Sequence, residues 1–210
     1  MSGSILVLPG GGYARLAPHE GEPVAEWLRG LGWDARVVEY PVGTRHPGPL
    51  HAVQREIAVE RAAGHSVVGL LGFSAGGHLA GHAALTAPGA DFAVLCYPVV
   101  SMESRTHIGS RDNLLGPRPW WWTKRALSLD RMVTADSPPM FVWTTGEDAA
   151  VEPVDHTYRL GAALARHGVP HDLHVFAEGR HGLGFAEGLP AEAWRALCER
   201  WLEQFAASVG

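Results

Sequence analysis

The sequence predicts an α/β fold, in which a mostly parallel central sheet of about six strands is covered by helices on both faces. Two observations lead to this expectation. Apolar segments of strand length alternate with segments of helix length along most of the 210 residues. In addition, the sequence Gly-Phe-Ser-Ala-Gly at residues 72–76 stands between an apolar run and a helical segment. Such a strand, turn and helix together lift a serine to the top of a sheet.

The first half of the chain alternates strands and helices with clear breaks between them. Residues 4–8 form a mainly apolar strand that stops at Pro9 and three glycines. The apolar run from Val67 to Leu71 has the composition of a parallel strand buried on both faces. The expected elements are strand 4–8, helix 22–31, strand 34–39, helix 50–63, strand 66–71 and helix 76–86.

The second half continues the same alternation after one long interruption. We expect strand 92–97, strand 139–145, helix 153–167, strand 171–176 and helix 190–207. Between the first two of these strands lies the irregular segment 99–138, rich in Pro, Ser and Trp. It is longer than an ordinary connection, and we interpret it as a small cap with a role in binding. No further segment remains for a second domain, so we expect one domain over residues 1–210.

Composition and charge exclude several classes of partner. The formal net charge is -5 and the basic residues form no cluster, which argues against nucleic acid or an anionic membrane as partner. Residues 1–4 lead directly into the first strand without a signal-peptide pattern, and no apolar run is long enough to cross a membrane. We therefore expect a cytoplasmic protein. Cys96 and Cys198 are too few and too far apart for a metal site, and we interpret both as buried free thiols.

Ser74 is the candidate nucleophile. A serine hydroxyl reacts poorly at neutral pH, so it requires a base, a group that orients the base, and donors for an oxyanion. On a sheet of this kind the acid and then the histidine follow the serine, each at the end of its own strand. Strand 171–176 runs into a Gly-flanked loop that carries His181, the candidate base.

The candidate acid is Asp148, which follows strand 139–145 and the turn at Gly146. It would hold the imidazole of His181 in the orientation that accepts the proton of Ser74. Glu147 and Asp155 lie close by in the sequence and remain alternatives.

The oxyanion donors are expected from two places. The amide of Ala75, directly after the nucleophile, supplies one. The loop after the first strand supplies the others, Gly11 and Gly12, because consecutive glycines let the backbone turn its N–H groups toward a ligand. A phosphate cradle is the weaker interpretation, since neither a Walker motif nor the G-x-G-x-x-G spacing is present.

Tyr13 and the run Trp120, Trp121 and Trp122 are the candidate substrate-binding residues. Three adjacent tryptophans cannot all face one side of a helix, so at least one is expected to be exposed or to line a cleft. Aromatic faces stack well on sugar rings. The alternative is a small helix that packs on the sheet edge or on a second subunit, so a homo-oligomer is possible.

Six motifs in order along the chain resemble the compact carbohydrate-esterase branch of the α/β-hydrolases, which includes acetylxylan and feruloyl esterases. These are Pro9–Tyr13, Pro18–Pro23, Arg45–Pro47, Gly72–Ala80, Asn113–Gly116 and Gly179–Gly184. The resemblance implies an α/β-hydrolase fold and a serine carboxylesterase that needs no metal or other cofactor. It also implies that the substrate is a small ester, often an acetyl ester of a sugar.

We therefore expect an esterase that forms an acyl-Ser74 intermediate with small, water-soluble esters such as acetylated sugars or xylo-oligosaccharides. Two alternatives remain. The same residues would also cleave activated amides, as an arylformamidase does. A binding protein on a hydrolase scaffold, without catalysis, is the other.

Overall fold

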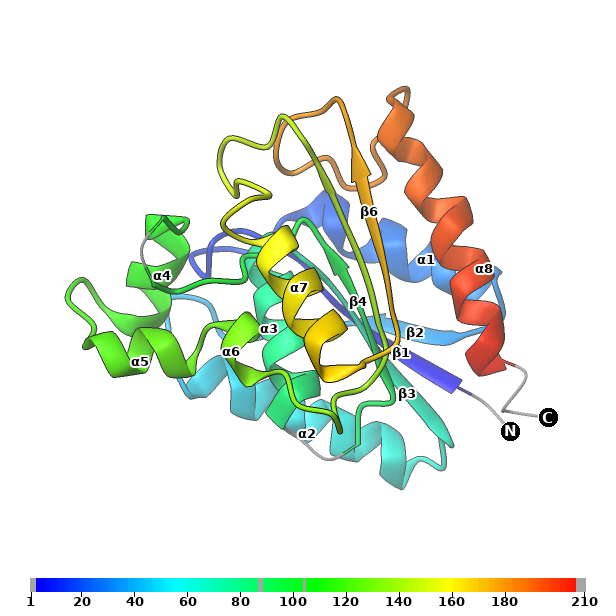
Figure 1. Ribbon diagram of the computed structural model, residues 1–210. Helices are drawn as coiled ribbons and strands as arrows, with labels where there is room; N and C mark the ends of the chain where they lie inside the picture. The colour runs from blue at the N-terminus through cyan, green and yellow to red at the C-terminus, as the bar shows by residue number, and fades with distance from the viewer. Residues whose placement is uncertain (1–2, 87–88, 104, 207–210) are drawn as a thin grey trace.

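The computed structural model describes residues 3–86, 89–103 and 105–206. Its centre is a sheet of six strands in the order β2-β1-β3-β4-β5-β6, and every neighbouring pair is parallel (Figure 1). The strands are β1 Gly3–Leu8, β2 Asp34–Val37, β3 Val67–Phe73, β4 Phe92–Cys96, β5 Met140–Thr145 and β6 His171–Phe176. The predicted α/β fold with a six-stranded sheet is therefore confirmed.

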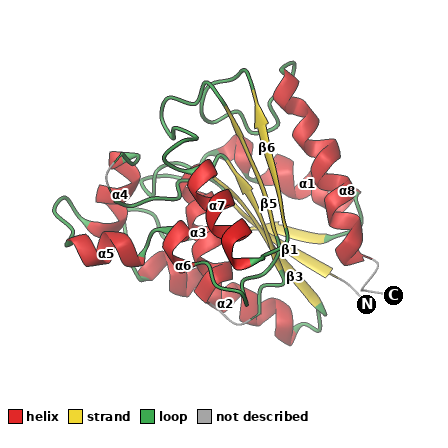
Figure 2. Cartoon of the chain, viewed as in Figure 1, coloured by secondary structure: helices red, strands yellow, loops and turns green. Residues whose placement is uncertain are grey.

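Helices cover both faces of the sheet, as Figure 2 shows in red. Helices α1 and α8 lie on one face, and α2, α3 and α7 lie on the other (Figure 1). Their bounds are α1 Glu22–Gly30, α2 Gly48–Ala62, α3 Ser74–Thr86, α7 Thr157–His167 and α8 Trp194–Ala206. Short 3-10 turns precede α1 and α8, at Pro18–Glu20 (η1) and Pro190–Ala193 (η2). The predicted helix 190–207 ends on a residue outside the described ranges.

Each face of the sheet has its own apolar core. β3 and β4 are buried along their whole length, which explains why they read as continuous apolar runs. On the α1 and α8 face, Trp194, Cys198 and Trp201 form a stripe at helical spacing that packs toward β4 and β5. α3 is buried from Ser74 to Ala84, because its small residues let it lie close to the sheet.

The segment 99–138 is more regular than expected. Three short helices lie within it, α4 Ile108–Leu115, α5 Trp121–Ala126 and α6 Leu129–Met132. The prediction of an irregular segment was wrong here, because helices of this length leave too few turns for a periodic pattern. The turn between α4 and α5 contains Gly116 at φ 89° and two prolines, and it stops any longer helix.

The order of the strands fixes where a ligand can bind. From β1 the chain crosses first to β2 on one side and then to β3 on the other, so the loops after β1 and β3 diverge at the same end of the sheet. Such a switch point opens a crevice outside the carboxyl ends of the strands. The loops that follow β5 and β6 gather at this end as well (Figure 2).

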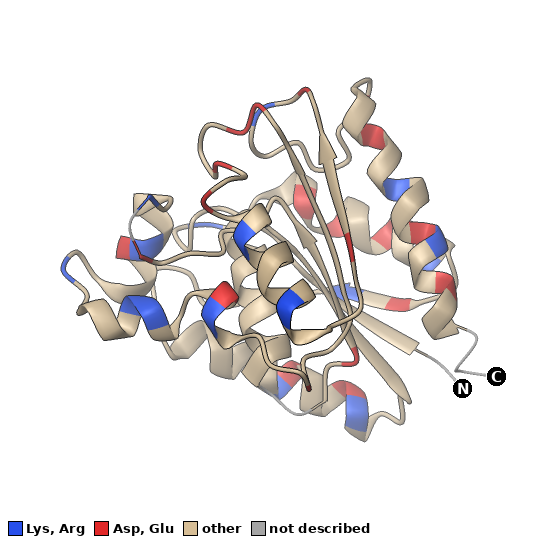
Figure 3. Ribbon diagram, viewed as in Figure 1, with Lys and Arg blue, Asp and Glu red and all other residues tan. Residues whose placement is uncertain are grey.

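Charged residues lie mainly on the helices and loops, and few lie on the strands (Figure 3). Cys96 and Cys198 are both buried free thiols, as predicted. Within the described residues, no helix combines the length and the apolar character that crossing a membrane requires.

Candidate active site

Ser74 stands at the junction of β3 and α3 with an unusual backbone. Its φ is 53°, a left-handed value that costs energy in a residue with a side chain. The two glycines of the motif are needed for close packing rather than for such a conformation. A Cβ on Gly72 would lie 2.3 Å from the carbonyl oxygen of Gly76, and one on Gly76 would lie 2.1 Å from that of Leu8. The strain is thus carried by the serine itself, as in a nucleophile elbow.

The structure brings the three candidate catalytic side chains into one hydrogen-bonded line. Ser74 Oγ lies 2.7 Å from His181 Nε2, and His181 Nδ1 lies 2.6 Å from Asp148 Oδ2. Since a carboxylate only accepts, Nδ1 carries the proton and Nε2 is left to accept the hydroxyl hydrogen of Ser74. The Asp148 side chain is fully buried, whereas that of His181 is 22% exposed toward solvent.

The loop after β5 explains why Asp148 takes this position. Its Oδ1 accepts the backbone N–H groups of Ala150 at 3.0 Å and Val151 at 2.9 Å, so the carboxylate closes its own turn and leaves Oδ2 for the histidine. Glu147 points elsewhere and accepts the N–H of Gly179 at 3.0 Å. Asp155 Oδ2 lies 3.9 Å from Arg105 Nη1. Neither alternative acid bonds to His181 in the described structure.

The glycine loop after β1 lies beside Ser74 and has the conformation that the sequence suggested. Gly11 and Gly12 have φ values of 125° and 68°, which residues with side chains rarely adopt. The carbonyl of Gly11 accepts the N–H groups of Ala14 and Arg15, and that of Gly12 accepts Asn113 Nδ2 at 2.9 Å. Within the described residues, no hydrogen bond occupies the amides of Gly11 and Gly12. Ala75 is the second residue of α3, where helix N–H groups lack partners within the helix.

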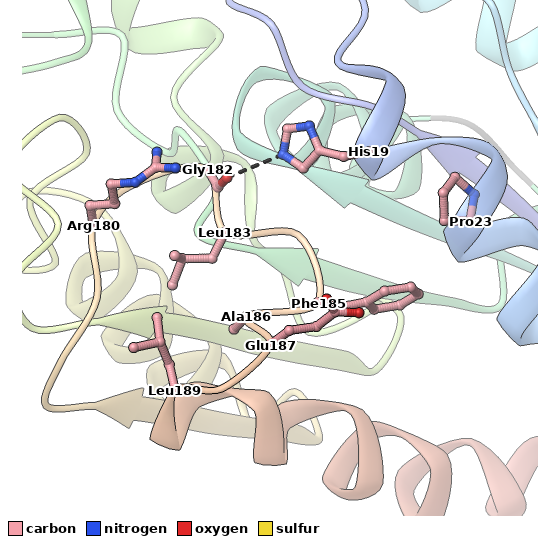
Figure 4. Close-up of a pocket in the computed structure, with 9 residues that line it drawn as sticks. All are labelled: His19, Pro23, Arg180, Gly182, Leu183, Phe185, Ala186, Glu187 and Leu189. Atoms are coloured by element: carbon pink, nitrogen blue, oxygen red, sulfur yellow. Dashed lines mark hydrogen bonds between the residues drawn. The ribbon is translucent and has the colours of Figure 1, made fainter.

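A cleft of about 460 Å³ contains these groups. Gly11, Gly12, Ser74 and His181 line it, together with residues of η1 and α4. A second hollow of about 560 Å³ adjoins it and shares His19, Arg180 and Gly182 with it. Figure 4 shows this second hollow and the hydrogen bond of 3.1 Å between His19 Nε2 and the carbonyl oxygen of Gly182. The apolar side chains of Leu183, Phe185 and Leu189 belong to its wall.

Tyr13 does not reach the cleft, and the expectation that it binds substrate was wrong. Its side chain is fully buried, and its hydroxyl donates to His78 Nδ1 at 2.6 Å. The carbonyl oxygen of Leu127 accepts the Nε2–H of His78 at 2.8 Å, which leaves Nδ1 of the neutral imidazole to accept from Tyr13. Burial raises the pKa of Tyr13 and lowers that of His78 to about 4. Tyr13 and His78 therefore connect the glycine loop after β1 to Leu127 in the cap segment 99–138.

The structure also keeps the three tryptophans away from the cleft. Trp120, Trp121 and Trp122 are 67%, 66% and 50% exposed, and none of them lines the space around Ser74. The rings of Trp120 and Trp122 stack on each other with their centres 4.7 Å apart. They thus form an exposed aromatic surface on α5, and contact with an extended substrate stays a prediction.

Two residues of α4 and its N-cap line the cleft without having been predicted as site residues. His107 and Asn113 line the cleft from the segment that we expected to be irregular. His107 Nδ1 bonds to Ser110 at the start of α4, and burial, with the neighbouring His181, lowers the pKa of His107. The resemblance had already drawn attention to the Asn113 motif, but no pattern in the sequence placed His107 beside the serine.

One group of side chains in the described residues could hold a metal ion, and it lies far from this cleft in the fold. Asp34, Glu60 and His65 place ligand atoms within 4.8 Å of one another. Asp34 is the first residue of β2, so the group lies at the amino end of the sheet, opposite Ser74. Arg36 donates to Glu60 at 2.7 Å, which supplies a cation to this group from the protein itself.

The arrangement around Ser74 has the parts that acyl transfer requires. A hydroxyl bonds to an accepting imidazole, a buried carboxylate holds that imidazole, and free backbone amides lie along the same cleft. No residue from the Asp34 group lines this cleft.

The chain is similar to known proteins in both sequence and structure. The chain is 32% identical over 215 residues to endo-1,4-beta-xylanase B of Butyrivibrio fibrisolvens, covering 90% of this chain and 34% of that protein. It is 31% identical over 199 residues to an acetylxylan esterase of Xylanibacter ruminicola, covering 87% of this chain and 41% of that protein. The chain thus spans less than half the length of these curated relatives.

Among solved structures, the acetyl ester-xyloside bifunctional hydrolase of Caldicellulosiruptor lactoaceticus superposes with a TM-score of 0.92 at 38% identity, over 98% of this chain and 84% of that one. The sequence pattern of the prolyl oligopeptidase family matches residues 39–208, which include Ser74, Asp148 and His181. The chain therefore belongs to the prolyl oligopeptidase family and has the α/β-hydrolase fold.

Proposed function

We propose that the chain is a carboxylic ester hydrolase that removes small acyl groups from sugars, with acetylated xylo-oligosaccharides as the leading substrate class. The observation that carries this proposal is the hydrogen-bonded line from Ser74 through His181 to Asp148 beside a solvent-accessible cleft. The names of the relatives add the substrate class, because an acetylxylan esterase and an acetyl ester-xyloside hydrolase are among them.

In the proposed mechanism Ser74 Oγ attacks the ester carbonyl while His181 Nε2 takes its proton. The amides of Gly11, Gly12 and Ala75 stabilise the negative charge on the carbonyl oxygen. His181 then passes the proton to the sugar oxygen, which leaves as an alcohol, and the acyl group remains on Ser74. Water, activated by the same imidazole, releases the acid and regenerates the serine. Asp148 stabilises the imidazolium in both halves.

The size of the cleft favours small acyl groups. About 460 Å³ is at the lower end of the range for ligand sites, and the neighbouring hollow of about 560 Å³ gives room for the sugar that leaves. Part of the wall is polar, from His107, Asn113 and Arg180, which suits hydroxyl groups better than a long alkyl chain.

The first test compares p-nitrophenyl acetate with p-nitrophenyl octanoate. We expect the protein to favour the acetate, and Ser74→Ala to lose roughly three orders of magnitude in kcat or more. Ser66→Ala is the matched control. Ser66 is exposed and directly precedes β3, at the end of this strand opposite Ser74. Release of acetate from acetylated xylobiose would then support the substrate class. Unchanged activity in Ser74→Ala would contradict the mechanism.

An amide hydrolase of the arylformamidase type is the second candidate, since the matched family is named for oligopeptidases that cleave amide bonds. Rates on an aryl formamide and an aryl acetate of the same leaving ring distinguish the two. A higher kcat/KM for the formamide would favour the amidase. If a fluorophosphonate fails to label Ser74, the non-catalytic binding protein is favoured instead.

A further inference from the structure

Glu20 is a buried carboxylate that bonds to no lysine or arginine in the described structure. It is the last residue of η1, and only 2% of its surface is exposed. Among the described residues, the one basic group within 4.0 Å of this carboxylate is His19, whose Nε2 lies 3.6 Å from Glu20 Oε1. A buried carboxylate is costly unless hydrogen bonds replace the lost water. The hydrogen bonds of the Glu20 carboxylate therefore show which groups stabilise it in its buried position.

The first of these bonds reaches the glycine loop. Glu20 Oε2 accepts the backbone N–H of Gly10 at 2.8 Å, directly before the two candidate oxyanion donors. A Cβ on Gly10 would lie 2.6 Å from this oxygen and 3.1 Å from the Cβ of Ser74. Gly10 is thus closely packed against both the Glu20 carboxylate and Ser74. Glu20 itself lines the cleft.

The second bond reaches the loop that carries His181. Tyr97, which follows β4, donates from its hydroxyl to Glu20 Oε1 at 2.6 Å and accepts the N–H of Gly184 at 2.8 Å. The ring of Tyr97 also lies edge-on against the ring of His181, with centres 5.1 Å apart. One carboxylate is therefore connected through a single tyrosine to the ring of the base and to the backbone of Gly184 in the loop that carries the base.

His19 adds a third connection between the same parts. Its Nε2 bonds to the carbonyl oxygen of Gly182, the residue after His181, at 3.1 Å (Figure 4). The segment from Gly182 to Gly184 is thus held at its start by the neighbour of Glu20 and at its end by Tyr97. Because loop segments are otherwise free to shift, these bonds fix the base relative to the glycine loop.

We propose that Glu20 is a positioning residue that aligns the oxyanion amides and the His181 loop with Ser74 through its two carboxylate oxygens. This role rests on the proposed function, because it concerns the same acyl transfer. Loss of one bond would let the glycine loop and the base drift independently. Misplacement on the scale of 1 Å costs on the order of 10²-fold in rate even when binding is intact.

The test compares Glu20→Gln with Glu60→Gln. Glu60 is a matched control because it is 6% exposed, bonds to Arg36 at 2.7 Å and lies at the opposite end of the sheet. In Glu20→Gln the amide can accept from only one of the two partners, so we expect kcat for p-nitrophenyl acetate to fall about tenfold to a hundredfold with KM within about threefold. Glu60→Gln should lower the melting temperature and leave kcat unchanged.

Two further variants extend the test: Tyr97→Phe alone, and Glu20→Gln combined with Tyr97→Phe. Removing the Tyr97 hydroxyl breaks the connection to the base but spares the bond to Gly10. If the two residues act as one unit, the double variant loses much less than the product of the single losses. Multiplied losses would show independent effects and overturn the shared alignment.

Labelling of Ser74 by a fluorophosphonate gives a readout independent of the ester. If wild type is labelled but hydrolyses no ester, the proposed substrate fails, while slower labelling of Glu20→Gln would still support the alignment. If Glu20→Gln is labelled and turns over at the wild-type rate and only melts earlier, Glu20 is structural and the proposal is wrong.

Discussion

Asp148 Oδ2 lies 2.6 Å from His181 Nδ1, although the two residues come from loops after different strands. Asp148→Asn keeps the size of the side chain but offers an N–H group to the imidazole, which favours the tautomer that cannot accept from Ser74. We expect kcat on p-nitrophenyl acetate to fall by about 10³- to 10⁴-fold. Steady-state kinetics of Glu147→Gln and Asp155→Asn, both within about fivefold of wild type, complete the comparison. A larger loss in either of these would move the acid to that residue.

Gly11→Ala tests the glycine loop. The new Cβ would lie 2.2 Å from the carbonyl oxygen of Arg15 at a φ of 125°, so the loop must move. Displaced oxyanion donors should lower kcat by about 10²-fold or more. Gly32→Ala is the control, since its φ of 92° brings similar strain with nothing within 4 Å. If both variants lose stability but neither loses kcat, the glycine loop does not hold the oxyanion.

Tyr13→Phe should act on stability and not on substrate. The change leaves His78 Nδ1 buried without its donor, which costs about 1–3 kcal/mol in the free energy of unfolding. Urea denaturation at neutral pH measures the loss. KM for p-nitrophenyl acetate should stay at the wild-type value, and a raised KM with normal stability would restore Tyr13 as a substrate contact.

The buried histidines predict acid sensitivity. Burial lowers the pKa of His78 to about 4, of His82 to about 3 and of His156 to about 4. The unfolded chain takes up protons at these groups near pH 6.5, while the folded chain does not, so stability falls as pH drops from about 6.5 toward 4. Each group contributes a slope of about 1.4 kcal/mol per pH unit in that window.

Urea denaturation at several pH values between about 5 and 7.5 checks this slope. His82→Gln should flatten it by one group, whereas His167→Gln, at an exposed position, should leave it unchanged. A stability profile that is flat over this range would contradict the lowered pKa values of the buried histidines in the folded protein.

The exposed tryptophans should be dispensable for small esters. Because neither residue lines the cleft, Trp120→Ala and Trp122→Ala should change kcat/KM on p-nitrophenyl acetate by less than about twofold. Acetate release from acetylated xylo-oligosaccharides, measured on the same variants, tests the stacking of a longer chain. A loss on the small ester would place an aromatic side chain nearer to Ser74 than the structure does.

Much of the fold and the line of candidate catalytic residues could be predicted from local patterns. Ser74 directly follows β3, and Asp148 and His181 lie in the loops after β5 and β6, so the parallel sheet brings all three to the same end. The choice of Asp148 over Glu147 also depends on local geometry, since one carboxylate closes its own turn and the other does not.

The remainder depends on contacts between distant segments, which leave no periodic signal. Tyr13 follows the glycines directly, yet packing against His78, 65 positions away, turns its side chain into the core. His107 lines the cleft from the N-cap of α4, a short helix within the long segment between β4 and β5. Glu20 likewise gains its partners from the loops after β1 and β4, and nothing in its own segment reveals them.

In the described part of the chain, β6 is an edge strand that pairs with β5 alone, whereas the strand before Ser74 lies in the middle of the sheet. A strand with one neighbour separates at a lower free energy than the whole domain unfolds. When it opens, the loop with His181 leaves while the serine keeps its place. The temperature at which hydrolysis stops should therefore lie below the calorimetric transition, and cooling from that interval should restore full turnover.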